Sequence, residues 1–129
     1  MKILGIGVDI IQNKRIKASI RNHKFKDRIF SSKELKLSNY SKNKIGFFSK
    51  RFAAKESFAK ALGTGFRNNL DFKDIEIIND KLGKPYYLIN LKIQKMIKKE
   101  KKTNKFKLFL SISDERDYSI AFTIIQKIS

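Results

Sequence analysis

The sequence has no cysteine and no tryptophan, and only one proline and one histidine among its 129 residues. The lack of cysteine excludes disulfides, thiol nucleophiles and Cys-ligated zinc. The single histidine, His23, lies in the polar run Arg21-Asn-His-Lys24, where we expect a surface residue. A Ser-His-Asp triad is therefore not expected, and a metal cluster built from several histidines is impossible.

Long hydrophobic runs are also missing. The stretch from Met1 to Ile11 is apolar but is too short, and too soon interrupted by Asp9, for a signal or membrane helix. No Gly/Ser/Pro-rich linker and no internal repeat divide the chain, and its length suits one core. We expect a single domain over residues 1–129, soluble and cytoplasmic, without a membrane partner.

Positive charge is abundant. Thirty Lys and Arg residues stand against twelve Asp and Glu, which gives a net charge of +18 and a pI near 10.2. Such a field attracts nucleic acid, anionic membrane, phosphorylated cofactors or acidic proteins, and its sign alone does not choose among them. Equally, many lysines could be solvated residues of a Lys/Ile/Asn-rich composition, with no specific partner.

The order of hydrophobic patterns predicts an α+β fold, because helices gather in the first half and strands in the second, around one early strand. The Ser31-Ser-Lys-Glu34 stretch is a capping box that opens a helix, and Gly63 suits the left-handed residue that ends the longest helix. Strands are expected over residues 2–11, 74–79, 86–89, 106–113 and 118–125, and further helices over 14–21, 44–62 and 91–102.

Asp9 is an acid inside the apolar first strand. Aspartate is poor in strands and is rarely buried without a partner, so Asp9 needs an Arg or Lys, backbone donors or a metal ion. Judged alone, a structural salt bridge is the more ordinary solution, with a metal site as the alternative.

Glu56 also has two interpretations. With Lys60 it forms an i, i+4 pair, which on a helix surface stabilises by only ~0.3–0.5 kcal/mol. Alternatively, Phe52 and Ala59 place Glu56 at the border of the buried face, where its carboxylate could enter a cleft. If Asp9 and Glu56 converge, their oxygens suit Mg²⁺, which keeps open positions for substrate phosphates.

The neighbours of such a site suit a phosphate. Lys60 would provide a point charge, and Gly63, Thr64 and Gly65 would form a bare backbone loop that a phosphate or a pantetheine arm could approach closely.

Several stretches, in this order, resemble the holo-[acyl-carrier-protein] synthases, the small bacterial 4′-phosphopantetheinyl transferases, over nearly the whole chain. The hallmark helix is Arg51-Phe-Ala-Ala-Lys-Glu56. The other matching stretches are Gly5–Ile11, Arg28–Leu35, Ala61–Gly65, Leu82–Pro85, Ser111–Ser113 and Tyr118–Ala121.

This resemblance implies the transfer of 4′-phosphopantetheine from coenzyme A to a serine of apo acyl carrier protein, for fatty acid biosynthesis, with release of adenosine 3′,5′-bisphosphate. By the same resemblance Asp9 and Glu56 bind Mg²⁺, and Glu56 takes the serine proton, either directly or through a metal-bound water. Lys60 acts with them as a catalytic residue. The family is typically a homotrimer with active sites between subunits. Coenzyme A contacts are implied for Lys60, Gly63, Thr64, Gly65, Lys84, Pro85 and Ser113.

The resemblance also gives the charge a partner, since acyl carrier proteins are strongly acidic. Arg15 matches the main docking position, supported by Arg21 and Lys24. One departure is Asp114-Glu115, where the family usually has a histidine that contacts a coenzyme A phosphate. The alternative function is a basic nucleic-acid-binding module, with aromatic residues among lysines at 105–107 and at 47–48.

Overall fold

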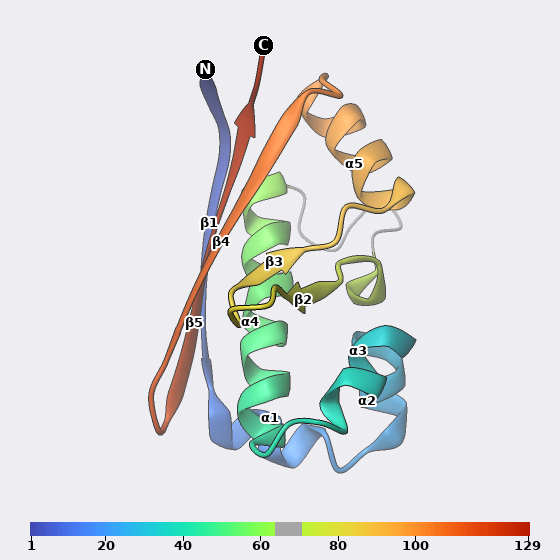
Figure 1. The fold of residues 1–129 in the computed structure, drawn as a ribbon, viewed down its shortest axis with the longest axis vertical. Coiled ribbons are helices and arrows are strands. Elements are labelled where there is room, and N and C mark those ends of the chain that lie inside the picture. The colour runs from blue at the N-terminus through green and yellow to red at the C-terminus, as the bar shows by residue number, and fades with distance from the viewer. Residues whose placement is uncertain (64–70) are drawn as a thin grey trace.

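A computed structural model of the protein describes residues 1–63 and 71–129, so Thr64 and Gly65 lie outside the described residues. A long helix packs along one face of a three-stranded antiparallel sheet, as Figure 1 shows. In chain order the elements are β1 (Lys2–Gln12), α1 (Asn13–Ser19), α2 (His23–Ile29), α3 (Ser32–Ser38), α4 (Lys44–Leu62), the 3-10 turn η1 (Phe72–Asp74), β2 (Ile77–Asn79), β3 (Pro85–Tyr87), α5 (Leu91–Lys101), β4 (Phe106–Asp114) and β5 (Tyr118–Lys127). The predicted α+β class is confirmed.

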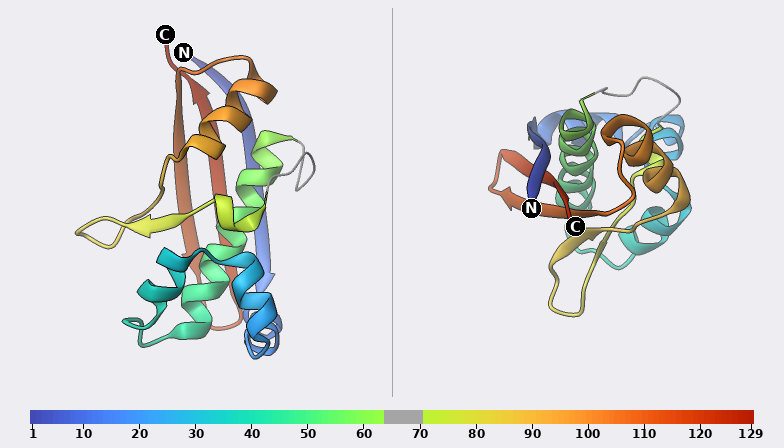
Figure 2. Two further views of the ribbon diagram at one scale, coloured as in Figure 1. Left: turned by 90° about the vertical axis from the view of Figure 1, so that its right-hand side faces the viewer. Right: turned by 90° about the horizontal axis from the view of Figure 1, so that it is seen from above.

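The three-stranded sheet has the order β1-β5-β4, so β1 is an edge strand. The small β2-β3 hairpin forms a second sheet and projects away from the body on the side opposite β1 (Figure 2). Helix α4 contacts both β1 and β5, and its buried side chains form the centre of the core with α5 and the first helices. This arrangement brings the β1 edge beside the C-terminal half of α4.

Helix signals in the sequence are confirmed where they rest on capping chemistry. The Ser31 hydroxyl accepts from the Glu34 amide at 3.2 Å, and Glu34 Oε1 accepts from the Ser31 amide at 3.0 Å. Gly63 ends α4 with φ of +91°, and its amide donates to Ala59 O and Lys60 O. A left-handed glycine at this position satisfies the carbonyls that end the helix.

Two local predictions are wrong. The strand expected from Asp74 begins only at Ile77, because Asp74 belongs to η1, where its Oδ2 accepts from the Asp71 amide at 3.2 Å. Helix α2 was missed in the polar run around His23. It forms because Asn22 Oδ1 caps the Lys24 amide at 2.9 Å, while Phe25 and Ile29 turn one face to the core.

Gly7 permits the close approach of β1 and α4. A Cβ placed there would lie 1.9 Å from Ser57 O and 2.6 Å from Ala61 N, both of them helix backbone. We expect Gly7→Ala to force the two elements apart and to lower the free energy of unfolding by roughly 3 kcal/mol, at the upper end for an overpacked core. Urea unfolding measures this change.

Gly83→Ala is the matched control, since Gly83 has φ of +87° but nothing within 4 Å of its Cβ position. That variant should lose only ~1–2 kcal/mol, the strain of a left-handed alanine. Equal losses of unfolding free energy in the two variants would show that the close approach of β1 and α4 does not determine the cost of Gly7→Ala.

Candidate active site

Asp9 and Lys60 meet at the β1 edge. Asp9 Oδ1 lies 3.1 Å from Lys60 Nζ, which also donates to the backbone oxygen of Val8 at 3.0 Å. Asp9 pairs with Ala121 across the β1-β5 ladder, so its side chain shares the face of the sheet that α4 covers. Of the partners considered for Asp9, a salt bridge with a lysine is observed. The Lys60 side chain is 54% exposed, so its ammonium is held on one side only.

Glu56 completes a group of three charges. Partial burial raises the pKa of Glu56, the negative charge of Asp9 raises it further, and Lys60 lowers it. Burial likewise raises the pKa of Asp9, while the bond and charge of Lys60 lower it. The two carboxylates therefore lie close enough to repel each other, and the ion pair that Lys60 forms is with Asp9 rather than with Glu56.

Two mutually repelling carboxylates and one lysine leave a net negative charge that a cation would offset. Carboxylate oxygens are hard ligands of the kind that Mg²⁺ prefers, and Mg²⁺ commonly binds through one or two carboxylates plus substrate phosphates. No cluster of three or more His, Cys, Asp or Glu residues with metal-binding geometry occurs in residues 1–63 and 71–129. The residues present thus fit an open magnesium site with two protein ligands, Asp9 and Glu56.

Gly63 lies one turn beyond Lys60, at the exposed end of α4. Its missing side chain leaves the backbone accessible, as the predicted phosphate contact requires. The other two residues of the predicted loop, Thr64 and Gly65, fall outside the described part of the chain.

Ser113 lies on the opposite face of the sheet from Asp9. The ladder aligns Asp9 with Ala121 and Ile112, and the next row aligns Ile10 with Ile120 and Ser113. Successive side chains of a strand point to opposite faces, and two strand spacings separate β1 from β4 by about 9.5 Å. Within one chain, Ser113 is therefore not brought to the carboxylates.

Lys84 and Pro85 are also remote from Asp9. They lie at the turn of the β2-β3 hairpin, which projects away from the body (Figure 2). Asp80 Oδ1 orders this turn by accepting from the amides of Leu82 and Lys84 at 2.9 Å each. Of the predicted coenzyme A contacts in the described residues, Lys60 and Gly63 lie at the β1-α4 edge, whereas Ser113, Lys84 and Pro85 lie elsewhere in the chain.

Arg15, Arg21 and Lys24 are all exposed, on α1, on the turn after it and on α2. Beside Lys24 lies an open depression of about 500 Å³ lined also by Phe25 and Arg28. The three predicted docking residues are thus exposed along the α1-α2 segment, where they are accessible to a partner.

Glu115 acts within the β4-β5 turn. Its Oε1 accepts from the amides of Asp117 and Tyr118 at 2.9 and 2.8 Å. Asn13 Nδ2 donates to the backbone oxygens of Glu115 and Arg116, which ties the turn to the start of α1. Of the two acids Asp114 and Glu115, which replace the residues usual in the family, Glu115 therefore stabilises the β4-β5 turn.

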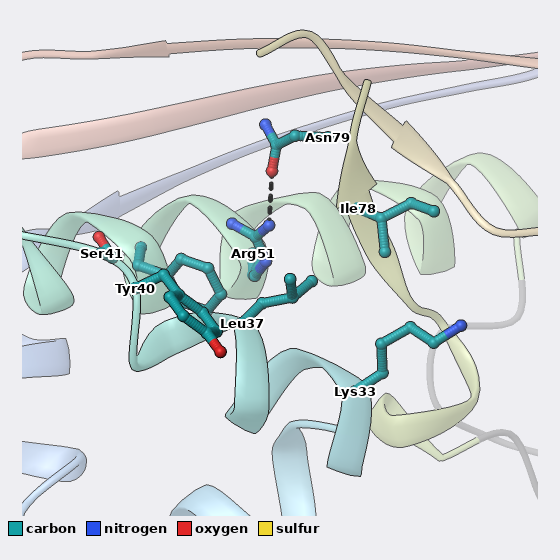
Figure 3. Close-up of a pocket in the computed structure, with 8 residues that line it drawn as sticks. Lys33, Leu37, Tyr40, Ser41, Arg51, Ile78 and Asn79 are labelled. Atoms are coloured by element: carbon teal, nitrogen blue, oxygen red, sulfur yellow. Dashed lines mark hydrogen bonds between the residues drawn. The ribbon is translucent and has the colours of Figure 1, made fainter. Parts of the chain in front are cut away.

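A second cationic site, at Arg51, was missed by the sequence analysis. Arg51 lines a pocket of about 570 Å³ and stacks 3.7 Å from the Phe47 ring centroid. Its Nη2 donates to Asn79 Oδ1 at 2.7 Å, as Figure 3 shows. Its buried Nε has no hydrogen-bond partner among residues 1–63 and 71–129, and burial lowers the pKa of Arg51 to about 10. An arginine in an alanine-rich buried helix was the available signal. The pocket can receive an anionic group.

The aromatic residues that motivated the nucleic-acid alternative belong to the core. Phe47 and Phe48 are buried, and Phe106 is half-buried and packs against the core cluster. Single-stranded nucleic acid binds to exposed aromatic faces, which these residues do not offer. No helix of the described residues is long and apolar enough to cross a membrane.

Comparison with known proteins identifies the family. The family model described as the 4′-phosphopantetheinyl transferase superfamily matches residues 5–123. The chain belongs to this superfamily. Among relatives of the transferase, the holo-[acyl-carrier-protein] synthase of Pelagibacter ubique (strain HTCC1062) is 59% identical, over 98% of this chain and 99% of its own length. That of Clostridium tetani is 50% identical over 96% of both chains.

Solved structures agree with the fold of the transferase. The holo-[acyl-carrier-protein] synthase of Neisseria meningitidis has a TM-score of 0.87 at 37% identity, covering 98% of this chain and 100% of its own. The enzyme of Bacillus anthracis, solved in complex with coenzyme A (3′,5′-ADP), has a TM-score of 0.81 at 32% identity over 98% of both chains. The transferase is therefore an enzyme with the expected phosphopantetheinyl transferase fold.

Proposed function

We propose that the enzyme transfers 4′-phosphopantetheine from coenzyme A to a serine of apo acyl carrier protein, in the cytoplasm and for fatty acid biosynthesis. The observation that carries this proposal is the grouping of Asp9, Glu56 and Lys60 at one open edge. The names of its relatives, and the coenzyme A bound in the Bacillus anthracis enzyme, support the same activity.

Each residue of the group has a distinct task. Asp9 and Glu56 would hold Mg²⁺, which would supply positive charge to offset the negative charge of the pyrophosphate of coenzyme A. Glu56 accepts the proton of the carrier serine as the general base. Lys60, half exposed beside Asp9, presents its ammonium to a phosphate oxygen.

The serine oxygen forms a bond to the phosphorus of the pantetheine phosphate, and the bond from that phosphorus to the bridging pyrophosphate oxygen breaks. The leaving group takes the bonding electrons as adenosine 3′,5′-bisphosphate. The exposed basic residues Arg15, Arg21 and Lys24 would attract the acidic carrier and bring its serine to this edge, an attraction that salt weakens.

We further propose a homotrimer whose active sites are completed between subunits. The face of the sheet away from α4 carries apolar side chains that are large and exposed, including Val8 at 52% and Ile10 at 58%. Ser113 lies on this same face. An exposed apolar face of this kind marks an interface, and a second copy packed there could bring Ser113, Lys84 and Pro85 toward another chain's Asp9 and Glu56. Large apolar side chains exposed on this face include Ile6, Val8, Ile10, Phe109, Ile120 and Phe122.

Charge placed in this face should dissociate the assembly. Phe122→Lys puts an ammonium beside Val8, its ladder partner, and burying an unpaired charge is costly. We expect sedimentation analysis to find a monomer without transfer activity. Leu91→Lys, at a residue 71% exposed on α5, is the control and should stay trimeric and active. A Phe122→Lys variant that remains trimeric, or an active wild-type monomer, would contradict the interface.

Incubation with coenzyme A, Mg²⁺ and an apo acyl carrier protein tests the function. Mass spectrometry should show the carrier heavier by one phosphopantetheine group, and Asp9→Ala should abolish the gain. An unchanged carrier mass with both Mg²⁺ and Mn²⁺, from enzyme shown to be folded and trimeric, would reject the proposal.

A further inference from the structure

The last turn of α5 lies over the C-terminal end of α4, as the first view of Figure 2 shows. The contact between them is specific. Lys101, the last residue of α5, places its Nζ 4.0 Å from the position that a Cβ would take on Gly63. Space left by the missing side chain of Gly63 is therefore bordered by an ammonium group.

A second lysine, Lys60, lies on the same helix as Gly63. It lies three residues before Gly63, with its Nζ on Asp9. Bare backbone at Gly63 with the Lys101 ammonium 4.0 Å away, and with Lys60 one helical turn earlier, suits a phosphate group. The glycine allows close approach, and each ammonium can donate charge-assisted hydrogen bonds.

We infer that Lys101 is a phosphate-binding residue of the coenzyme A site, acting beside Gly63, one helical turn beyond Lys60. This inference rests on the proposed function, which places coenzyme A along Gly63, and it adds a residue that no motif of the sequence indicated. The α5 helix positions the lysine through Ile93 and Ile97, which are fully buried, so that its basic C-terminal end is fixed against α4.

Lys101 could instead serve only the stability of α4. A cation near the C-terminal carbonyls of a helix is stabilising by ~0.3–1 kcal/mol, and it would do so without any ligand. Removing the Lys101 charge separates the two roles. If Lys101 only stabilises α4, the melting temperature falls and coenzyme A affinity is unchanged. If Lys101 binds a phosphate, coenzyme A affinity falls.

Calorimetric titration of the full-length protein with coenzyme A separates them. Lys101→Gln should weaken coenzyme A binding about tenfold, the size expected when one charged hydrogen bond is lost. Lys101→Arg, which keeps the charge, should restore most of the affinity. Lys98→Gln, at an exposed lysine one turn earlier on α5, is the matched control and should bind as the wild type does.

Repeating the titration with dephospho-coenzyme A identifies the phosphate. The same loss with both ligands assigns the contact to the pyrophosphate, and a loss confined to coenzyme A assigns it to the 3′-phosphate; both outcomes support the inference. Lys101→Gln that binds like Lys98→Gln would overturn it. Wild-type protein that binds coenzyme A but transfers nothing would instead count against the proposed reaction.

Discussion

Replacing Glu56 by glutamine is expected to lower kcat about 10²–10⁴-fold, the usual contribution of a general base. The amide keeps the size of the side chain but neither accepts the serine proton nor offers a charged oxygen to a cation. Single-turnover transfer to apo carrier measures the change. Without a divalent cation, burial and the charge of Asp9 raise the pKa of Glu56. A cation bound to its carboxylate would lower that pKa, so the acid-side fall of the rate should move to lower pH as the Mg²⁺ concentration rises.

Glu56→Gln, which lowers kcat, should raise the thermal stability of the enzyme at neutral pH. A carboxylate whose pKa is raised on folding is destabilised in its charged form, so its ionisation weakens the fold above the folded pKa and has no effect below the unfolded pKa. Glu56→Gln, measured without divalent cations, should therefore unfold at a higher temperature than wild type at neutral pH but not in acid. Glu76→Gln, at another half-buried acid, controls for both readouts and should retain transfer. A Glu56→Gln enzyme with near wild-type kcat would remove Glu56 from the chemistry.

Loss of one partner of the buried Lys55-Glu34 pair should be the most destabilising change among the polar residues. Both side chains are fully buried, with Lys55 Nζ 2.7 Å from Glu34 Oε1. The ammonium also donates to the backbone oxygens of Phe72 and Ile75, and Glu34 Oε2 accepts from the Ile77 amide. We expect Lys55→Met to lower the free energy of unfolding by ~3–5 kcal/mol, because it leaves an uncompensated buried carboxylate.

A double-mutant cycle in urea tests this account. Adding Glu34→Leu to Lys55→Met removes the unpaired charge and should recover part of the loss. Lys36→Met, at an exposed lysine of α3, should change stability by less than ~0.5 kcal/mol. If Lys55→Met were no worse than Lys36→Met, the pair would not hold η1 and β2 to the helices.

The parts of the fold that the sequence predicted are those governed by local chemistry. Helix 44–62, its glycine end and the Ser31 capping box each depend on residues within one or two turns, and all are observed. The residues at Asp74 were predicted as a strand but form a 3-10 turn, and helix α2 was not predicted. In both places hydrogen bonds to the side chains of Asp74 and Asn22 decide the local structure, not the hydrophobic pattern.

The site was predictable as far as its residues could be recognised one by one. Asp9 was expected to need a partner. Lys60 pairs with Asp9 rather than with Glu56 because Gly5 and Gly7 let β1 approach α4 closely, which the sequence alone does not reveal. The position of Ser113 behind the sheet follows from ladder register, which sequence motifs do not encode. Lys55 was missed for a similar reason, since its partner Glu34 lies on another helix.

The central claim is that the oxygens of Asp9 and Glu56 share one divalent cation with the pyrophosphate of coenzyme A. A crystal structure of the enzyme with coenzyme A and Mn²⁺ tests it most directly, with the manganese located in an anomalous difference map. We predict one manganese peak per active site, in contact with both carboxylates and a pyrophosphate oxygen. Bound coenzyme A with no manganese at these side chains, or with manganese held elsewhere in the site, would contradict the account.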